Sequence, residues 1–407
     1  MSSDQPERLH ALDAVRGFAL IGGVAFHAAL SFLPGPQMWI VMDSQRSVIL
    51  SVLFFTLHMF RMAVFFLIAG FMARLILQRR GGWGFVRDRA RRIALPLVVG
   101  WPILFASIVA VTIWAAVKTL GPKVAAAAPP PPWPTLPNFP LTHLWFLYVL
   151  LLFYVAALVL HGLVAAIDRK GALGRGLDAV LVRLIVVAPL PLAAPLALAL
   201  VAQPVWMAWF GIATPDSSLI PNTPALVGYG TAFGLGWMLH RQTGLLDAIR
   251  RRWPLNLGLA IACTAACLYL IGLNPVVAPA AHDARTMAFA GLYALGVFAW
   301  TFGLIGLALR FASNHSPARR YVADASYWIY LVHLPIVMAL QTLISDQAWP
   351  WPVKYAAVVL GALALCLASY QLLVRHSFIG AVLNGRRTRR LAKPAAVSQP
   401  RTAGETL

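Results

Sequence analysis

The sequence predicts an all-α, polytopic membrane protein with about ten transmembrane helices and both termini in the cytoplasm. Its composition is 60% hydrophobic and 11% charged, whereas a soluble domain carries about 25% charged residues. Long apolar stretches recur along the chain, and the connections between them alternate between basic and nearly uncharged. These three observations together indicate that lipid surrounds the fold.

The apolar stretches are each long enough for a helix to cross the hydrocarbon core, which takes about 20 residues. Several prolines fall within them, and neighbouring helices can satisfy the carbonyls that a proline leaves free. The predicted spans cover residues 12–33, 51–77, 94–117, 143–166, 180–202, 222–240, 255–274, 287–309, 322–344 and 353–375.

The basic residues set the predicted orientation. The formal net charge is +20, from 33 Lys and Arg against 13 Asp and Glu. With the N-terminus in the cytoplasm, the inside connections hold basic clusters such as residues 79–92, and the outside connections hold few basic residues. This asymmetry is typical of cytoplasmic loops. It accounts for the charge without a nucleic-acid partner, and none is expected.

A single domain, residues 1–385, accounts for the membrane region, because no hydrophilic stretch is long enough to fold as a separate soluble domain. Residues 386–407 are basic and rich in small residues. We therefore expect a disordered cytoplasmic tail near anionic lipid headgroups. The predicted location is the cell inner membrane, crossed many times, with membrane lipid as a partner.

The first predicted span carries three ionisable residues, Asp13, Arg16 and His27. Such residues are costly inside a membrane, so each marks a candidate functional site. His27 follows Arg16 by eleven positions, or three turns plus about 20°, so the two share one face about 16 Å apart. Asp13 lies on the same face, one turn earlier. The alternative is an interfacial Asp13–Arg16 ion pair and a structural, hydrogen-bonded His27.

The second predicted span opens with His58 and Arg61, one turn apart. Arg61 is predicted to lie too deep in the membrane for its side chain to extend back and place its charge at the interface. It should therefore face the bundle or a wet cavity, paired with an anion or with carbonyls. The alternative is a structural ion pair.

The fourth predicted span opens with His143 and Trp145, and the ninth contains Tyr330 and His333. His143 falls at a predicted depth similar to that of His27, His58 and Arg61, in the outer half of the membrane, and His333 lies somewhat deeper. A neutral imidazole there can take a proton from an alcohol as a general base. The alternatives are interfacial belt residues, a core histidine, or the polar lining of a proton-coupled transporter.

A basic run precedes the third predicted span and includes Arg89 and Arg92. On a helix these two share a face, and a pair of guanidinium groups suits phosphate. The alternative is a loop that only sets topology.

The three cysteines lie in apolar stretches without a neighbouring His or acid that completes a metal set, so no metal is expected. Nucleotide-binding, zinc-protease and serine-esterase signatures are missing from the sequence.

These residues resemble the signatures of the acyltransferase 3 membrane family, over about residues 9–376. The resemblance rests on five elements: Asp13-Ala-Val-Arg16-Gly17 with His27 beyond it, Phe65-Phe-Leu-Ile-Ala-Gly70-Phe71, Arg89-x-x-Arg92 ahead of Pro96, His143-Leu-Trp-Phe-Leu147, and Ser326-Tyr-Trp-Ile-Tyr-Leu-Val-His333.

The resemblance implies a histidine-centred acyl transfer at His27, with an acyl-coenzyme A (acyl-CoA) as donor. It also implies donor contacts at Arg16, Arg89 and Arg92. Some branches carry a glutamate shortly after the His143–Trp145 element, where this chain has Tyr148, Val149 and Leu150. This chain therefore departs from those branches at that position. The residues predicted to be catalytic are His27, Asp13, Arg61 and His58, and those predicted to bind substrate are Arg16, Arg89, Arg92, His143, Trp145, Tyr330 and His333.

Within the family, His58-x-x-Arg61-Met62 is most similar to members assigned to succinylation of osmoregulated periplasmic glucans. The resemblance therefore implies succinyl transfer from cytoplasmic succinyl-CoA to hydroxyls of a periplasmic β-glucan. The alternatives are acetylation of another surface polysaccharide and, in a different class, a proton-coupled transporter. Paired halves with interrupted spans, which such a transporter would show, are not found. The acyl group, the acceptor hydroxyl, the oligomeric state and the choice between direct transfer and an acyl-enzyme relay stay open.

Cysteine labelling tests the predicted topology. In a background without Cys263, Cys267 and Cys366, a cysteine at Ala126 should react with an impermeant maleimide from outside, and one at Gly244 only from inside. The reason is that these residues lie in connections predicted to face opposite sides. The reverse pattern would rule out the predicted orientation.

Overall fold

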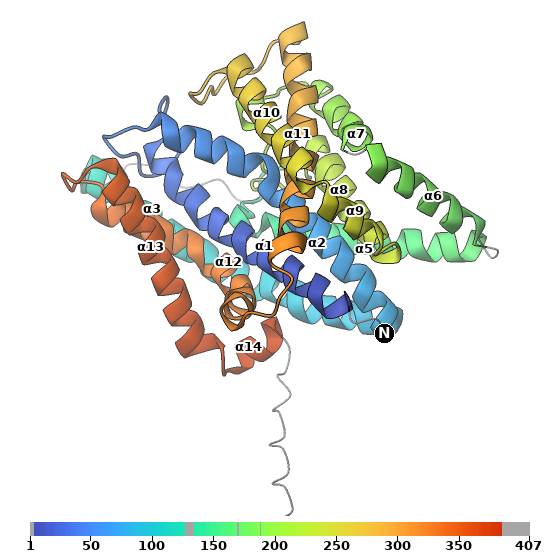
Figure 1. Ribbon diagram of the computed structural model, residues 1–407. Helices are drawn as coiled ribbons and strands as arrows, with labels where there is room; N and C mark the ends of the chain where they lie inside the picture. Colours follow the sequence, from blue (N-terminus) through green and yellow to red (C-terminus); the bar gives the residue numbers. More distant parts are fainter. Residues whose placement is uncertain (1–3, 127–133, 169–170, 188, 385–407) are drawn as a thin grey trace, which may run out of the picture.

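The computed structural model describes residues 4–126, 134–168, 171–187 and 189–384, and every regular element in those ranges is helical. The basic tail 386–407 lies outside the described residues. Figure 1 shows the helices of the bundle. They are α1 (Asp4–Ala29), α2 (Val48–Arg89), α3 (Leu95–Leu120), α4 (Pro122–Ala126), α5 (Trp145–Ile167), α6 (Ala172–Val187), α7 (Leu190–Val201), α8 (Thr223–Arg241), α9 (Leu245–Arg251), α10 (Trp253–Ile271), α11 (Ala284–Phe311), α12 (Pro317–Ile344), α13 (Trp351–Ser369) and α14 (Phe378–Leu383).

Seven helical stretches of the described chain are long and apolar enough to cross a membrane. One of them, Val48–Leu120, has 73 residues and contains both the second and the third predicted spans. It bends at Gly81, whose φ of 67° suits a residue without a Cβ. The membrane-protein class is therefore supported, whereas the count of ten spans and the orientation of the termini stay predictions.

The predicted span 180–202 is not one helix. The structure divides this stretch into α6 and α7, and α7 has 12 residues, fewer than a membrane crossing needs. Pro189 is the N-cap of α7 and Pro191 lies in its first turn. A proline lacks the N–H that would continue a helix from the preceding turn, so it favours a helix start at this point.

Helix α1 lies at the centre of the bundle and contacts α2, α11, α12 and α13 (Figure 1). Helix α2 in turn packs closely along α8. A Cβ at Gly70 would lie 1.9 Å from the carbonyl oxygen of Phe233, and one at Gly236 would lie 1.9 Å from that of Leu67. These two glycines allow the helix backbones to touch, which is a common way to join helices in lipid. The contact fixes α2, and with it His58 and Arg61, against the rest of the bundle.

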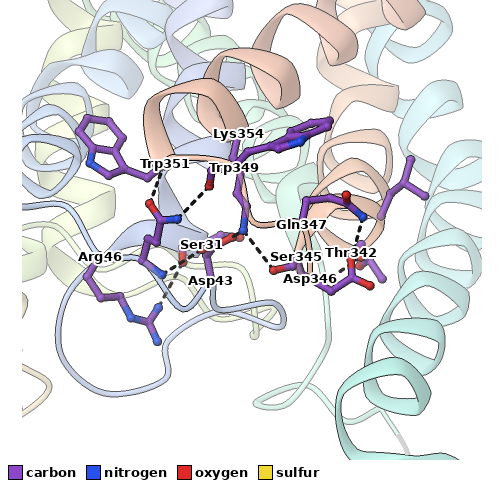
Figure 2. Close-up of polar contacts among 12 residues, drawn as sticks. Ser31, Asp43, Arg46, Thr342, Ser345, Asp346, Gln347, Trp349, Trp351 and Lys354 are labelled. Carbon is purple, nitrogen blue, oxygen red and sulfur yellow. Dashed lines mark hydrogen bonds and ion pairs between the residues drawn. The ribbon is translucent and has the colours of Figure 1, made fainter.

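A buried ion pair closes the bundle beyond the C-terminal end of α1. Lys354 on α13 is 0% exposed, and its Nζ lies 2.7 Å from Oδ2 of Asp43, in the α1–α2 connection. Lys354 also donates to the Ser345 carbonyl oxygen, and the Asp43 N–H donates to that of Ser31 (Figure 2). The sequence placed Lys354 at the edge of a span. The structure shows that it connects the α1–α2 and α12–α13 loops.

Replacing Lys354 with Met should destabilise the protein by about 3–5 kcal/mol, because Asp43 would stay buried without its partner. The unfolding midpoint in lipid nanodiscs, followed by tryptophan fluorescence, measures the effect. The double change Lys354→Met with Asp43→Asn should recover part of the loss. Lys118→Met is the control, because Lys118 pairs with the more exposed Asp346 and should change the midpoint little. Equal effects of the two lysine changes would contradict this assignment.

Candidate active site

Four histidines from four segments converge beside α1. The ring centroid of His27, on α1, lies 5.2 Å from that of His333, on α12. The His333 ring lies 5.6 Å from the ring of His143, which precedes α5. His58, on α2, stacks on Phe26 with its ring centroid 5.6 Å away. The polar residues predicted at similar depth therefore form one cluster.

Three of these histidines are held by backbone carbonyls. His58 Nε2 lies 3.1 Å from the Ile212 oxygen, and His143 Nε2 lies 2.8 Å from the Leu331 oxygen. His333 Nδ1 lies 3.0 and 2.8 Å from carbonyl oxygens of its own helix. Because a carbonyl only accepts, each of these nitrogens carries the proton in the neutral ring, and the other nitrogen offers a lone pair.

His143 follows a strained residue. Thr142 has a φ of 53°, and no other non-glycine residue of the described ranges has a positive φ. A β-branched residue in this conformation is a true outlier that the surroundings must hold in place. The Thr142 N–H donates to the Asp216 carbonyl oxygen over 3.0 Å, and the Tyr330 hydroxyl donates to that of His143 over 2.7 Å. The chain is thus fixed on both sides of the turn that positions His143.

Within the described residues, the His27 ring is not anchored to a backbone carbonyl as the other three are. Its Nδ1 is buried without a hydrogen-bond partner there, as is Nδ1 of His58. Its backbone, by contrast, is held: Gln341 on α12 donates to the carbonyl oxygens of His27 and Ala28 over 3.0 and 3.2 Å. The Gln341 oxygen accepts from the indole of Trp39, whose ring lies 6.1 Å from that of His27. The end of α1 is therefore positioned while the imidazole stays available.

Arg61 is the buried cation of the cluster. It is 8% exposed, and its guanidinium carbon lies 4.0 Å from the centroid of the Phe26 ring. Its Nη1 is buried without a hydrogen-bond partner, and no carboxylate within the described ranges forms an ion pair with it. The predicted alternative of a structural ion pair is therefore not observed. A buried charge without a counter-ion is costly, which makes Arg61 a candidate anion-binding group.

An inner cavity of about 380 Å³ follows α1 from Arg16 to His27. This volume is within the usual range for small-molecule sites. Arg16, Arg89 and Arg92 line its far end, and Tyr330 and His333 line the part beside His27. The spacing along α1 predicted this shared face.

Two of the arginines at the far end, Arg89 and Arg92, share one carboxylate with Arg80. Asp88 forms ion pairs with Arg80, Arg89 and Arg92, and its side chain is 4% exposed. Three guanidinium groups around one acid leave a net positive charge. The segment that carries Arg92, Ala90–Ala94, is a π-helical turn, and the Tyr327 hydroxyl donates to the Arg92 carbonyl oxygen over 2.6 Å. This end of the cavity can therefore bind an anion such as a phosphate.

An outer cavity of about 580 Å³ lies beyond His27, at the C-terminal end of α1. Trp39, His58 and Gln203 are among its lining residues. The two cavities share four lining residues and so meet at them: His27, Arg61, His143 and Trp145.

Asp13 is not brought to this centre. It lies outside the lining of both cavities and pairs with Arg16 at 3.2 Å. Fourteen residues of helix separate it from His27, or about 21 Å along the axis. Direct contact with a group reacting at His27 is therefore impossible. The structure therefore does not bring Asp13 together with His27, and it shows the Asp13–Arg16 ion pair that was the alternative interpretation. The catalytic role of Asp13 stays a prediction.

Two supporting residues were missed in the sequence. Gln341 is 2% exposed inside an apolar helix, and a polar side chain in a membrane segment is a signal that could have marked it. Trp39 lies in a connection and gave no such signal. Among the described residues, no group of three His, Cys, Asp or Glu side chains is arranged to hold a metal ion.

The chain is similar to known proteins in two comparisons. A family model described as an acyltransferase domain matches residues 9–371. The proteins named glucans biosynthesis protein C from Salmonella heidelberg and Salmonella dublin are each 27% identical to the chain over 161 residues. That alignment covers 37% of this chain and 38% of each relative's length. No solved structure matches significantly.

Proposed function

The chain belongs to the acyltransferase 3 family, and from this premise we propose that it moves succinyl groups across the membrane, from cytoplasmic succinyl-CoA to hydroxyls of periplasmic β-glucans. It is a membrane acyltransferase by its family and by its apolar helices. The observation that carries the finer proposal is the meeting of two cavities at His27 and Arg61. A transferase with a donor and an acceptor on opposite sides of a membrane needs this arrangement.

The donor enters the inner cavity. Its phosphates bind the arginine cluster around Asp88, at the end predicted to face the cytoplasm, and its pantetheine arm follows α1. The thioester then lies beside His27, about 16 Å from Arg16 along the helix axis. A coenzyme A molecule is long enough for this distance. The largely apolar side chains between the two ends, such as Leu20 and Ile68, suit an uncharged arm.

The acceptor enters the outer cavity, where one of its hydroxyl groups reaches His27. The imidazole takes the hydroxyl proton as the oxygen attacks the thioester carbon. The tetrahedral intermediate collapses when the carbon–sulfur bond breaks, and the thiolate takes the proton back from the imidazolium. The products are a sugar ester and free coenzyme A. The His333 ring, whose centroid lies 5.2 Å from that of His27, lines the same cavity beside it.

Two residues that line the outer cavity support its role in binding the acceptor. His58 lines only the outer cavity and is held by the Ile212 carbonyl. Trp145 lines both cavities and is 6% exposed, so its ring can pack on a sugar. The relatives' name refers to glucan biosynthesis, which favours a glucan over another surface polysaccharide as acceptor. Family membership also disfavours the transporter reading.

His27→Ala should lower acyl transfer by about 10²–10⁴-fold, because general-base catalysis would be lost. Single-turnover transfer from succinyl-CoA to β-glucan oligosaccharides by protein in nanodiscs measures the effect. Thermal unfolding of the same samples separates lost chemistry from lost folding. His161→Ala is the control, because His161 lines neither cavity. A stable His27→Ala protein with near-parental transfer would contradict the assignment of His27 as the general base.

The double change Arg89→Gln with Arg92→Gln should weaken binding of succinyl-CoA by about 10- to 100-fold, because charge-assisted hydrogen bonds to phosphate are lost. The matched control is Arg87→Gln with Arg91→Gln, which removes the same charge from two exposed side chains of the same run. Isothermal titration with protein in nanodiscs measures both. Equal weakening of succinyl-CoA binding in the two proteins would indicate that this basic run attracts the donor only nonspecifically.

A further inference from the structure

We propose that Arg61 selects the acyl group: it binds a free carboxylate at the end of the acyl chain, so that the preferred donors are thioesters of dicarboxylic acids. This inference rests on the proposed function and assigns a specificity-determining contact within the same site. It differs from the predicted catalytic role of Arg61, in which a guanidinium would stabilise the oxyanion of the intermediate.

The first reason is the state of the guanidinium before any ligand binds. Arg61 is more than nine-tenths buried, and its Nη1 points into surroundings that offer it no acceptor among the described residues. A buried cation in this state is strongly destabilising. An oxyanion forms only for the lifetime of an intermediate, whereas a carboxylate on the bound donor compensates the charge from the moment of binding.

The second reason is position. A Cβ built on Gly23 would lie 3.6 Å from Arg61 Nη1, and Gly23 precedes His27 by one helical turn on the same face. Arg61 therefore reaches across α1 next to the place where the thioester must lie. The acyl chain is the part of the donor that projects beyond the thioester. In a four-carbon dicarboxylic chain the far carboxylate is about 4 Å from the thioester carbon, three carbon–carbon bonds away.

The third reason is the geometry of the guanidinium. The Phe26 ring covers one face of Arg61 at 4.0 Å. The N–H donors lie in the plane of the group and stay free at its edge, and this fork matches the two oxygens of a carboxylate. Gly23 leaves room at this edge, since a Cβ there would already be in van der Waals contact with the guanidinium. The same space would let a neutral chain fit, but without satisfying the charge.

Comparing two donors of equal chain length separates the carboxylate contact from general catalysis. Succinyl-CoA and butyryl-CoA differ only at the chain end, where a carboxylate replaces a methyl group. We expect the parental protein in nanodiscs to transfer succinyl to β-glucan oligosaccharides about 10- to 100-fold more efficiently in kcat/KM, as a charged hydrogen-bonded pair provides. Arg61→Gln should remove this preference, mainly through succinyl-CoA. Arg61→Lys should keep part of it, since the charge stays while the fork is lost.

The control is Arg74→Gln, a change on the same helix at a residue that lines neither cavity, and it should keep the succinyl preference. Equal losses with both donors in Arg61→Gln would overturn the proposal in favour of an oxyanion role. The absence of a succinyl preference in the parental protein would also overturn it, and this measurement holds even if Arg61→Gln fails to fold. Failure of the parental protein to transfer any acyl group would instead contradict the proposed function.

Discussion

The interior of this bundle obeys one constraint: lipid offers no hydrogen bonds, so polar groups inside must find partners within the protein. His58, His143 and His333 each use one ring nitrogen to reach a backbone carbonyl. Lys354 and Asp43 satisfy each other in a fully buried pair. The same contacts that remove the cost of burial also fix the segments that carry them. The hydrogen bonds and ion pairs that satisfy the buried polar groups therefore also position the site.

Several polar groups depart from this constraint, and two of them, on His27 and Arg61, lie at the same place. His27 Nδ1 and Arg61 Nη1 are both buried without partners among the described residues, and both groups line the two cavities where these meet. An unsatisfied polar group costs about 1–3 kcal/mol, and more when it is charged. A protein that retains such a cost at the centre of its bundle gains something when a ligand arrives. A hydroxyl for the imidazole and an anion for the guanidinium would satisfy both groups.

Charge is graded along the inner cavity. Near the arginine end, Asp88 offsets part of the positive charge of Arg80, Arg89 and Arg92, so that the unliganded cluster is stable while a net positive charge remains for phosphate. Near His27, Arg61 has no such acid. The two ends therefore suit different parts of one donor. The polyanionic end of the donor suits the arginine cluster, where several positive charges are partly exposed. A single small anion suits Arg61, whose positive charge is isolated and buried.

The sequence by itself determined the all-helical membrane class, the approximate positions of the long helices outside residues 180–202, and the shared face of Arg16 and His27. These follow from composition and from the fixed 3.6-residue period of a helix, which are local properties. Only the tertiary structure decided which histidines are anchored, that Gln341 holds the end of α1, that Asp13 lies away from the centre, and that Arg61 has no counter-ion in the described part of the chain. These depend on which residues of other helices lie opposite a side chain. Contacts between segments hundreds of positions apart, such as Gln341 with His27, are set by packing of the whole bundle, and no local pattern encodes them.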